Sequence, residues 1–122
     1  MARLLVVDDA AFMRMTLQKM FEGHGHRVVA EASNGMEAVQ KYVDSKPDVV
    51  FMDISMPDMN GIEALKRIKA VDPKAKVVIC SAMGQQAMLA DAIQYGAMDF
   101  VVKPFQEERL IAALNKVLTI NH

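Results

Sequence analysis

The chain has 122 residues, of which 52% are hydrophobic and 24% charged, and its formal net charge is -1. These values are typical of one folded domain that buries about two-thirds of its surface, and they exclude a disordered segment or a polybasic nucleic-acid binder. The single cysteine, Cys80, cannot form an internal disulfide. No zinc-ligand cluster, signal peptide or membrane-spanning run is present in the sequence. We therefore expect one cytoplasmic, monomeric domain over residues 1–122 that binds neither nucleic acid nor membrane.

Five short apolar runs, rich in β-branched and aromatic residues, predict the strands of a sheet. They are Leu4–Val7, Val28–Ala30, Val49–Met52, Val77–Cys80 and Phe100–Val102. The runs do not alternate between apolar and polar residues, which is typical of strands buried on both faces of a parallel sheet. The intervals between the runs leave room for one helix each.

Each interval, and the segment after the last run, has apolar residues at helical spacing. The predicted inward faces are Met13, Leu17, Met20 and Phe21; Met36, Val39, Tyr42 and Val43; Ile62, Leu65 and Ile68; Leu89, Ala92 and Ile93; and Leu110, Ile111, Leu114, Val117 and Leu118. Ser33–Gly35 indicates the start of the second helix, Asp72–Pro73 the end of the third, and Pro57–Gly61 a turn. The alternation predicts an α/β fold of the (βα)5 type, with right-handed crossovers and helices on both faces of a parallel sheet.

Polar side chains stand at the ends of four of the predicted strands. Asp8 and Asp9 follow the first strand, Asp53 the third, Ser81 the fourth and Lys103 the fifth. All strands of a parallel sheet end at one edge, and ligands of doubly wound sheets bind at this carboxyl edge. We expect these five side chains to converge there.

The motifs around these residues resemble those of response-regulator receiver domains over essentially the whole chain. They are Val7-Asp8-Asp9, Met52-Asp53-Ile54-Ser55-Met56-Pro57 followed by Gly61, Cys80-Ser81-Ala82 and Val102-Lys103-Pro104-Phe105. The stretches 8–14 and 80–86 are also similar to single-domain chemotaxis regulators of the non-enteric type. The resemblance implies a flavodoxin-like, doubly wound parallel sheet with strand order 2-1-3-4-5, in which the strands before Asp8 and Asp53 are neighbours.

Three carboxylates in one crevice, those of Asp8, Asp9 and Asp53, require compensating positive charge. At a separation of about 5 Å, each pair repels by ~3 kcal/mol at an effective dielectric constant of about 20. Lys103 supplies one positive charge, and a divalent cation would cancel the remainder. Mg²⁺ suits this site better than Ca²⁺, because it binds a few carboxylates and keeps several waters. For Asp8 and Asp9 alone, a solvated helix start is the alternative interpretation.

The resemblance implies that Asp53 is the phosphoacceptor, which attacks a phosphohistidine of a histidine kinase and forms an acyl phosphate. It also implies a Mg²⁺ site formed by Asp8, Asp9, Asp53 and the backbone carbonyl of Ser55. In this site Asp9 binds the ion directly and Asp8 largely through water. Lys103, which precedes a cis proline in this family, is expected to contact a phosphoryl oxygen. Such a carboxylate can react when a metal ion masks part of its charge and neutralises the phosphoryl oxygens.

Ser81 and Phe100 are the residues expected to form the switch. The Ser81 hydroxyl would bond a phosphoryl oxygen, a charge-assisted contact worth about 1.5–3 kcal/mol. In the family, an aromatic residue three positions before the lysine turns inward as this hydroxyl moves. Here it is Phe100, so the switch lacks the phenolic hydroxyl of tyrosine-containing relatives; a plain strand aromatic is the alternative interpretation. Ala90, Gln94 and Tyr95 on the fourth helix, with Phe100, form the expected partner surface.

The residues two positions after Asp53 and Ser81 are Ser55 and Met83. In receiver domains these positions are often polar and orient the hydrolytic water. Met83 cannot orient water by hydrogen bonding, and we therefore expect Met83→Glu or Met83→Asn to alter the decay rate of the acyl phosphate.

The sequence therefore predicts a phosphorylation-dependent switch that catalyses only its own phosphorylation and dephosphorylation. The expected partners are a histidine kinase of the chemotaxis type, a flagellar motor switch protein and, as a further candidate, a phosphatase. A phosphorelay intermediate is the alternative within the same class. An aspartyl-phosphate phosphohydrolase is disfavoured. Those enzymes have an Asp-x-Asp pattern in which the second Asp is the acid/base, and Ser55 stands at that position here. A flavodoxin-type carrier is disfavoured because no Ser/Thr-rich loop follows the first strand.

Overall fold

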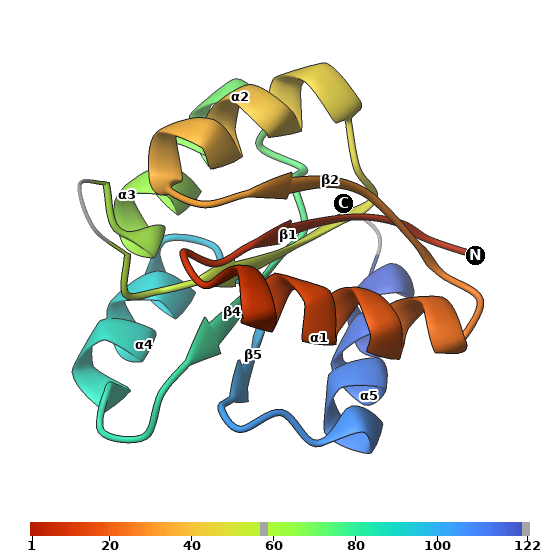
Figure 1. Ribbon diagram of the computed structural model, residues 1–122. Coiled ribbons are helices and arrows are strands. Elements are labelled where there is room, and N and C mark those ends of the chain that lie inside the picture. Colours follow the sequence, from red (N-terminus) through yellow and green to blue (C-terminus); the bar gives the residue numbers. More distant parts are fainter. Residues whose placement is uncertain (57–58, 121–122) are drawn as a thin grey trace.

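The structure is a computed structural model that describes residues 1–56 and 59–120. Strands and helices alternate along the chain as the sequence predicts (Figure 1). The elements are β1 (Arg3–Val7), α1 (Ala11–Gly23), β2 (Arg27–Ala32), α2 (Gly35–Ser45), β3 (Val49–Asp53), α3 (Gly61–Val71), β4 (Val77–Ser81), α4 (Gln86–Gln94), β5 (Asp99–Val102) and α5 (Glu107–Leu118). The turn predicted at Pro57–Gly61 lies partly outside the described residues, because residues 57 and 58 are not among them.

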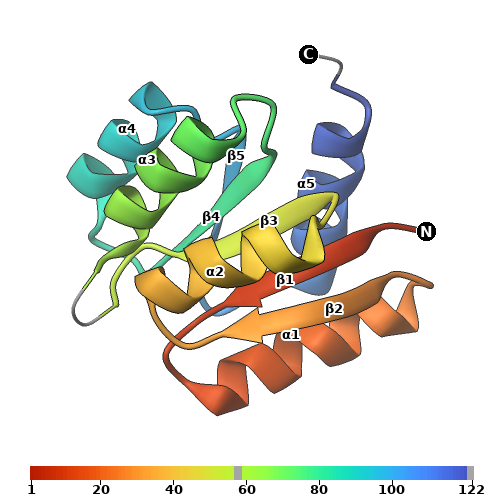
Figure 2. The same cartoon turned by 90° about the horizontal axis from the view of Figure 1, so that it is seen from above.

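The five strands form one parallel sheet in the order β2-β1-β3-β4-β5, which confirms the predicted flavodoxin-like topology. Helices α2, α3 and α4 cover one face, and α1 and α5 cover the other (Figures 1 and 2). Strands β3 and β4 are buried along their whole length. This burial explains why their sequences are continuously apolar up to the terminal polar residue.

The predicted inward faces of the helices are confirmed for α3 and α5 but are partly wrong for α4 and α2. On α4, Ile93 is 44% exposed, because its neighbour Ala92 occupies the buried position. Met36 and Val43 are 66% and 48% exposed, whereas Ala38 and Tyr42 are buried. The small Ala38 lets α2 approach the sheet closely, and the Tyr42 hydroxyl donates to Asp72 at 2.7 Å. Two adjacent apolar stripes on α2 have the same helical spacing, so periodicity alone does not distinguish the inward stripe from the outward one.

Two helix starts position the chain around the carboxyl edge of the sheet. Asn34 and Asn60 cap α2 and α3, where each side chain accepts a hydrogen bond from a backbone N–H in the first turn. At Gly61, the first residue of α3, a Cβ atom would overlap the carbonyl oxygen of Asp53 and lie 2.7 Å from Cα of Ile54. Only glycine therefore allows α3 to begin directly against the end of β3.

Among the described residues, every helix is too short or too polar to cross a membrane.

Candidate functional site

The three acidic residues predicted to converge do so at the carboxyl edge of the sheet. Asp8 and Asp53 are buried, with 1% and 4% of their surface exposed, whereas Asp9 is exposed. One carboxylate oxygen from each residue lies within 4.8 Å of the others. The cluster forms because β1 and β3 pair directly, with Val7 beside Met52.

The loop that carries Asp8 and Asp9 is fixed by several hydrogen bonds. The Asp8 N–H donates to the carbonyl of Ala32 at 3.1 Å, and Nη1 of Arg14 donates to the Asp8 carbonyl at 2.6 Å. Nε of Arg14 also donates to Glu31 at 3.0 Å. Arg14 is not among the residues that the sequence predicts for the site. Its only sequence signal is a long basic side chain on the first helix, close after the acidic pair.

Lys103 also lies where the sequence predicted. Its Nζ atom is 2.7 Å from Oδ2 of Asp8 and 3.4 Å from Oδ2 of Asp53. The peptide bond between Lys103 and Pro104 is cis, as expected. The Lys103 N–H donates to the Ser81 carbonyl at 2.7 Å, so the ends of β4 and β5 are held together at the site.

The electrostatics of the cluster reflect burial and close charge pairs. Burial raises the pKa of Asp53, and the charge of Asp8 adds to this effect; the Ser55 N–H, at 3.1 Å, and Lys103 oppose it. Burial alone would lower the pKa of Lys103, but its hydrogen bond to Asp8 and the negative charges beside it raise that pKa overall. Lys103 is therefore a stable ammonium. Burial raises the pKa of the Cys80 thiol, consistent with an unreactive cysteine.

The donor set fits a magnesium ion. Carboxylate oxygens are the ligands that Mg²⁺ prefers, and the ion usually keeps several of its waters. The three oxygens within 4.8 Å of one another match the first requirement. The exposure of Asp9 leaves the cluster open to water on one side and matches the second. The role of the Ser55 carbonyl stays a prediction.

The two residues expected to form the switch line one groove. Ser81 is the last residue of β4 and is buried, and Phe100 of β5 is partly buried. Both line a groove of about 400 Å³, together with residues that include Met83 and Leu89. Both residues therefore border the same open volume.

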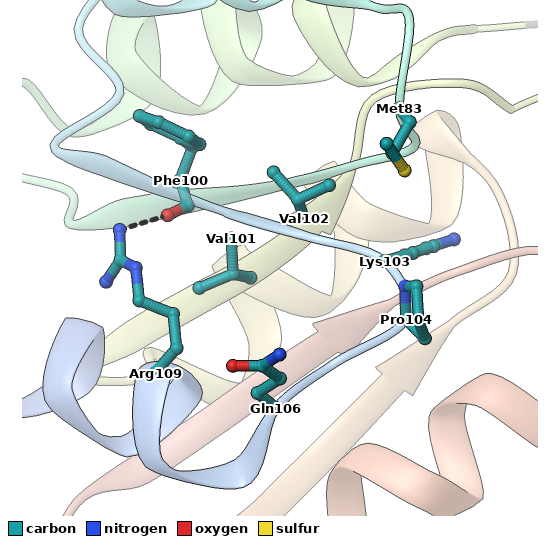
Figure 3. Close-up of a pocket in the computed structure, with 8 residues that line it drawn as sticks. All are labelled: Met83, Phe100, Val101, Val102, Lys103, Pro104, Gln106 and Arg109. Atoms are coloured by element: carbon teal, nitrogen blue, oxygen red, sulfur yellow. Dashed lines mark hydrogen bonds between the residues drawn. The ribbon is translucent and has the colours of Figure 1, made fainter.

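The residues of the expected partner surface are accessible. Ala90, Gln94 and Tyr95 of α4 are exposed, and Nζ of Lys66 lies 4.1 Å from the centre of the Tyr95 ring. A second groove of about 320 Å³ runs along β5 toward the start of α5 (Figure 3). It is lined by Met83, Phe100, Val101, Val102, Lys103, Pro104, Gln106 and Arg109.

The family model of the response regulator receiver domain matches residues 4–115. The chain therefore belongs to this family, and its likeness to CheY makes it a signalling protein rather than a classical enzyme. It is 60% identical to the chemotaxis protein CheY of Thermotoga maritima, over 94% of this chain and 96% of that protein. It is 58% identical to the chemotaxis protein CheY of Bacillus subtilis, over 95% and 97% of the two chains.

Solved structures give the same result. The response regulator domain of Thermotoga maritima CheB superimposes with a TM-score of 0.89 at 37% identity, over 98% of each chain. A CheX-CheY-BeF3-Mg complex from Borrelia burgdorferi gives a TM-score of 0.91 at 33% identity, over 97% of this chain and 90% of that chain. The chain is thus closely related to CheY in both sequence and structure, and its role is phosphorylation-dependent signalling.

Proposed function

We propose that the chain accepts a phosphoryl group on Asp53, in a magnesium-dependent reaction, and signals in chemotaxis by binding another protein. The observation that carries the proposal is the cluster of three carboxylates around Lys103. Asp53 is buried, its carboxylate lies within 4.8 Å of those of Asp8 and Asp9, and Lys103 is 3.4 Å away.

The chain's own residues have distinct tasks in this reaction. An oxygen of Asp53 attacks the phosphorus of a phosphohistidine; the new O–P bond forms while the P–N bond breaks, and its electron pair stays on the imidazole. Lys103 exchanges a contact with a carboxylate for a contact with a phosphoryl oxygen. Asp8, Asp9, Asp53 and the Ser55 carbonyl would hold Mg²⁺, Asp9 directly and Asp8 largely through water. When bound, Mg²⁺ neutralises the phosphoryl oxygens and aligns the displacement.

The raised pKa of Asp53 bears on its reactivity. A carboxylate whose negative charge is disfavoured by burial gains from converting that charge into a covalent bond. The Ser81 hydroxyl donates a hydrogen bond to a phosphoryl oxygen, and Phe100 turns toward the groove that both residues line.

The similarity to CheY supports chemotaxis as the setting. The proposed partners are a histidine kinase that supplies the phosphoryl group and a flagellar motor switch protein that binds the phosphorylated form. A phosphatase is a further candidate partner. A monomer located in the cytoplasm stays a prediction, as does the assignment of Ala90, Gln94, Tyr95 and Phe100 to the binding surface.

The deciding experiment is incubation with Mg²⁺ and acetyl phosphate, followed by intact-mass measurement. We expect one phosphoryl adduct on the wild-type protein, none on Asp53→Asn, and an unchanged adduct on Asp44→Asn, which alters an exposed carboxylate of α2. Removal of Mg²⁺ with a chelator should abolish the adduct. An adduct that persists in Asp53→Asn would refute the assignment of the phosphoacceptor.

Protein binding separates chemotaxis from a phosphorelay. A chemotaxis regulator binds a motor switch protein more tightly once it is phosphorylated and does not pass the group onward. A phosphorelay intermediate loses the group to a histidine phosphotransfer domain at the rate at which that domain gains it.

A further inference from the structure

The backbone of Phe100 is held by an ion pair that the proposed reaction does not use, formed by the buried Asp99 and the exposed Arg109. The Phe100 N–H donates to Oδ1 of Asp99 at 2.8 Å. Nη2 of Arg109 donates to the Phe100 carbonyl at 2.6 Å, as the dashed line in Figure 3 shows. Arg109 also bonds both oxygens of Asp99, at 3.1 and 3.4 Å. Both polar backbone groups of the proposed switch residue are thus bonded to one Asp99–Arg109 pair.

The guanidinium of Arg109 also lies beside the aromatic ring. Its Cζ atom is 5.8 Å from the centre of the Phe100 ring, within the ~6 Å reach of a cation–π contact. The Asp99 side chain is only 7% exposed, so the carboxylate fixes the position of the cation on α5. Nζ of Lys116 lies 3.9 Å from Asp99. Among the described residues, Lys116 makes no hydrogen bond or cation–π contact with Phe100 and therefore offers a matched control.

Phe100 forms part of the wall of two different grooves. The groove of about 320 Å³ contains Arg109 among its lining residues and does not include Ser81. The groove of about 400 Å³ is lined by Ser81 and does not include Arg109. A ring that turns toward Ser81 thus enters the groove that Arg109 does not line.

We infer that Arg109 is a positioning residue that holds Phe100 in its present orientation and opposes the inward movement of the ring. The inference rests on the switch roles proposed for Ser81 and Phe100. A contact made in only one of two states stabilises that state, and its removal shifts the equilibrium toward the other. By linkage, a ligand that prefers the second state then binds more tightly. Arg109 thus sets how easily phosphorylation at Asp53 moves Phe100.

The test uses beryllium fluoride with Mg²⁺ as a probe that mimics the acyl phosphate, and compares Arg109→Gln with Lys116→Gln. Each change removes one positive charge beside Asp99, but only the first removes a contact with Phe100. We expect Arg109→Gln to bind the probe about two- to fivefold more tightly than wild type, the factor that corresponds to an exposed cation–π contact. Lys116→Gln should match wild type.

The second readout is the NMR signal of the Phe100 ring in protein labelled with ¹³C-phenylalanine. Without the probe, Arg109→Gln should shift this signal toward its position in the probe-bound wild type, and Arg109→Lys should give a smaller shift in the same direction. Removal of a residue that only stabilised the fold would not shift the signal toward its probe-bound position. In a Phe100→Leu background, the effect of Arg109→Gln on probe affinity should decrease, because both changes remove the cation–π contact and only the hydrogen bond to the backbone carbonyl of residue 100 is left for Arg109→Gln to remove.

The outcomes separate the two proposals. If the wild-type protein fails to bind the probe, the proposed function fails and the inference fails with it. If wild type binds normally but Arg109→Gln behaves as Lys116→Gln does, the inference alone is overturned. Should Arg109→Gln not fold, Arg109→Lys decides the question, and wild-type affinity together with an unshifted Phe100 signal would overturn the inference.

Discussion

The ammonium nitrogen of Lys103 lies 2.7 Å from Oδ2 of Asp8, closer than its 3.4 Å distance to the proposed phosphoacceptor Asp53. The Asp8 side chain is only 2% exposed. Lys103 therefore compensates a buried negative charge in addition to its proposed contact with a phosphoryl oxygen. The same side chain therefore contributes to the stability of the fold and to the proposed reaction at Asp53.

We predict that Lys103→Met lowers the free energy of unfolding by about 3 kcal/mol at pH 7 without metal, because it leaves a buried charge unpaired. The folded-state pKa of Lys103 is raised, so its contribution is fully present below the ordinary lysine pKa. It is lost only as the pH rises through the folded value. Mg²⁺ should recover part of the loss, since it neutralises the same carboxylates.

Urea denaturation with and without Mg²⁺ measures both effects. Lys19→Met, which changes an exposed lysine of α1, serves as the control and should cost less than about 0.5 kcal/mol. A loss for Lys103→Met that is as small as that of the control, or that Mg²⁺ leaves unchanged, would contradict this prediction.

The convergence of Asp8, Asp53, Ser81 and Lys103 could be predicted because the ends of parallel strands share one edge, so strand position alone locates the side chains. The contacts that support them could not be predicted in this way. Arg14 bonds the carbonyl of Asp8, and every residue offers such a carbonyl, so the sequence carries no signal for the choice. Arg109 and the carbonyl of Phe100 are a second case.

Gly61 offers a direct test of how α3 approaches the site. A methyl group at this position would meet the backbone of Asp53 and Ile54, and backbone cannot yield as a flexible side chain does. We predict that Gly61→Ala lowers the free energy of unfolding by about 2 kcal/mol and slows phosphorylation of Asp53. Thermal unfolding and the acetyl phosphate assay measure the two effects.

Gly23→Ala is the matched control for this substitution, because nothing lies within 4 Å of a Cβ at Gly23, the last residue of α1. Alanine there should be neutral or stabilise the protein by up to about 1 kcal/mol. Equal stability of the two variants would show that the close approach at Gly61 does not constrain the chain.

The buried carboxylate of Asp99 should make stability depend on pH. Burial alone would raise the pKa of Asp99, but the hydrogen bonds from Arg109 and from the Phe100 N–H, with the charges of Arg109 and Lys116, lower it overall. A depressed folded-state pKa means that the contribution is present above the ordinary carboxylate value of about 4. It is lost as the pH falls through the folded value.

We therefore predict that Asp99→Asn lowers the free energy of unfolding by about 1.5–3 kcal/mol at pH 7. The difference from wild type should shrink as the pH falls below about 4. Urea denaturation over this pH range measures it, with Asp44→Asn as an exposed control that should show no such trend. A stability difference that stays constant down to the lowest pH measured would show that packing, and not the charge of Asp99, causes the loss of stability.

Met83 bears on the lifetime of the acyl phosphate. It lies on the loop after β4, is 82% exposed, and lines the groove that also contains Ser81. A thioether is a poor hydrogen-bonding group, so Met83 does not orient an attacking water. We predict that Met83→Glu and Met83→Asn each shorten the half-life of the acyl phosphate several-fold, because their side chains can hold water in line with the phosphorus. Met83→Leu should match wild type, and an unchanged half-life in both polar variants would rule out this position as a determinant of dephosphorylation.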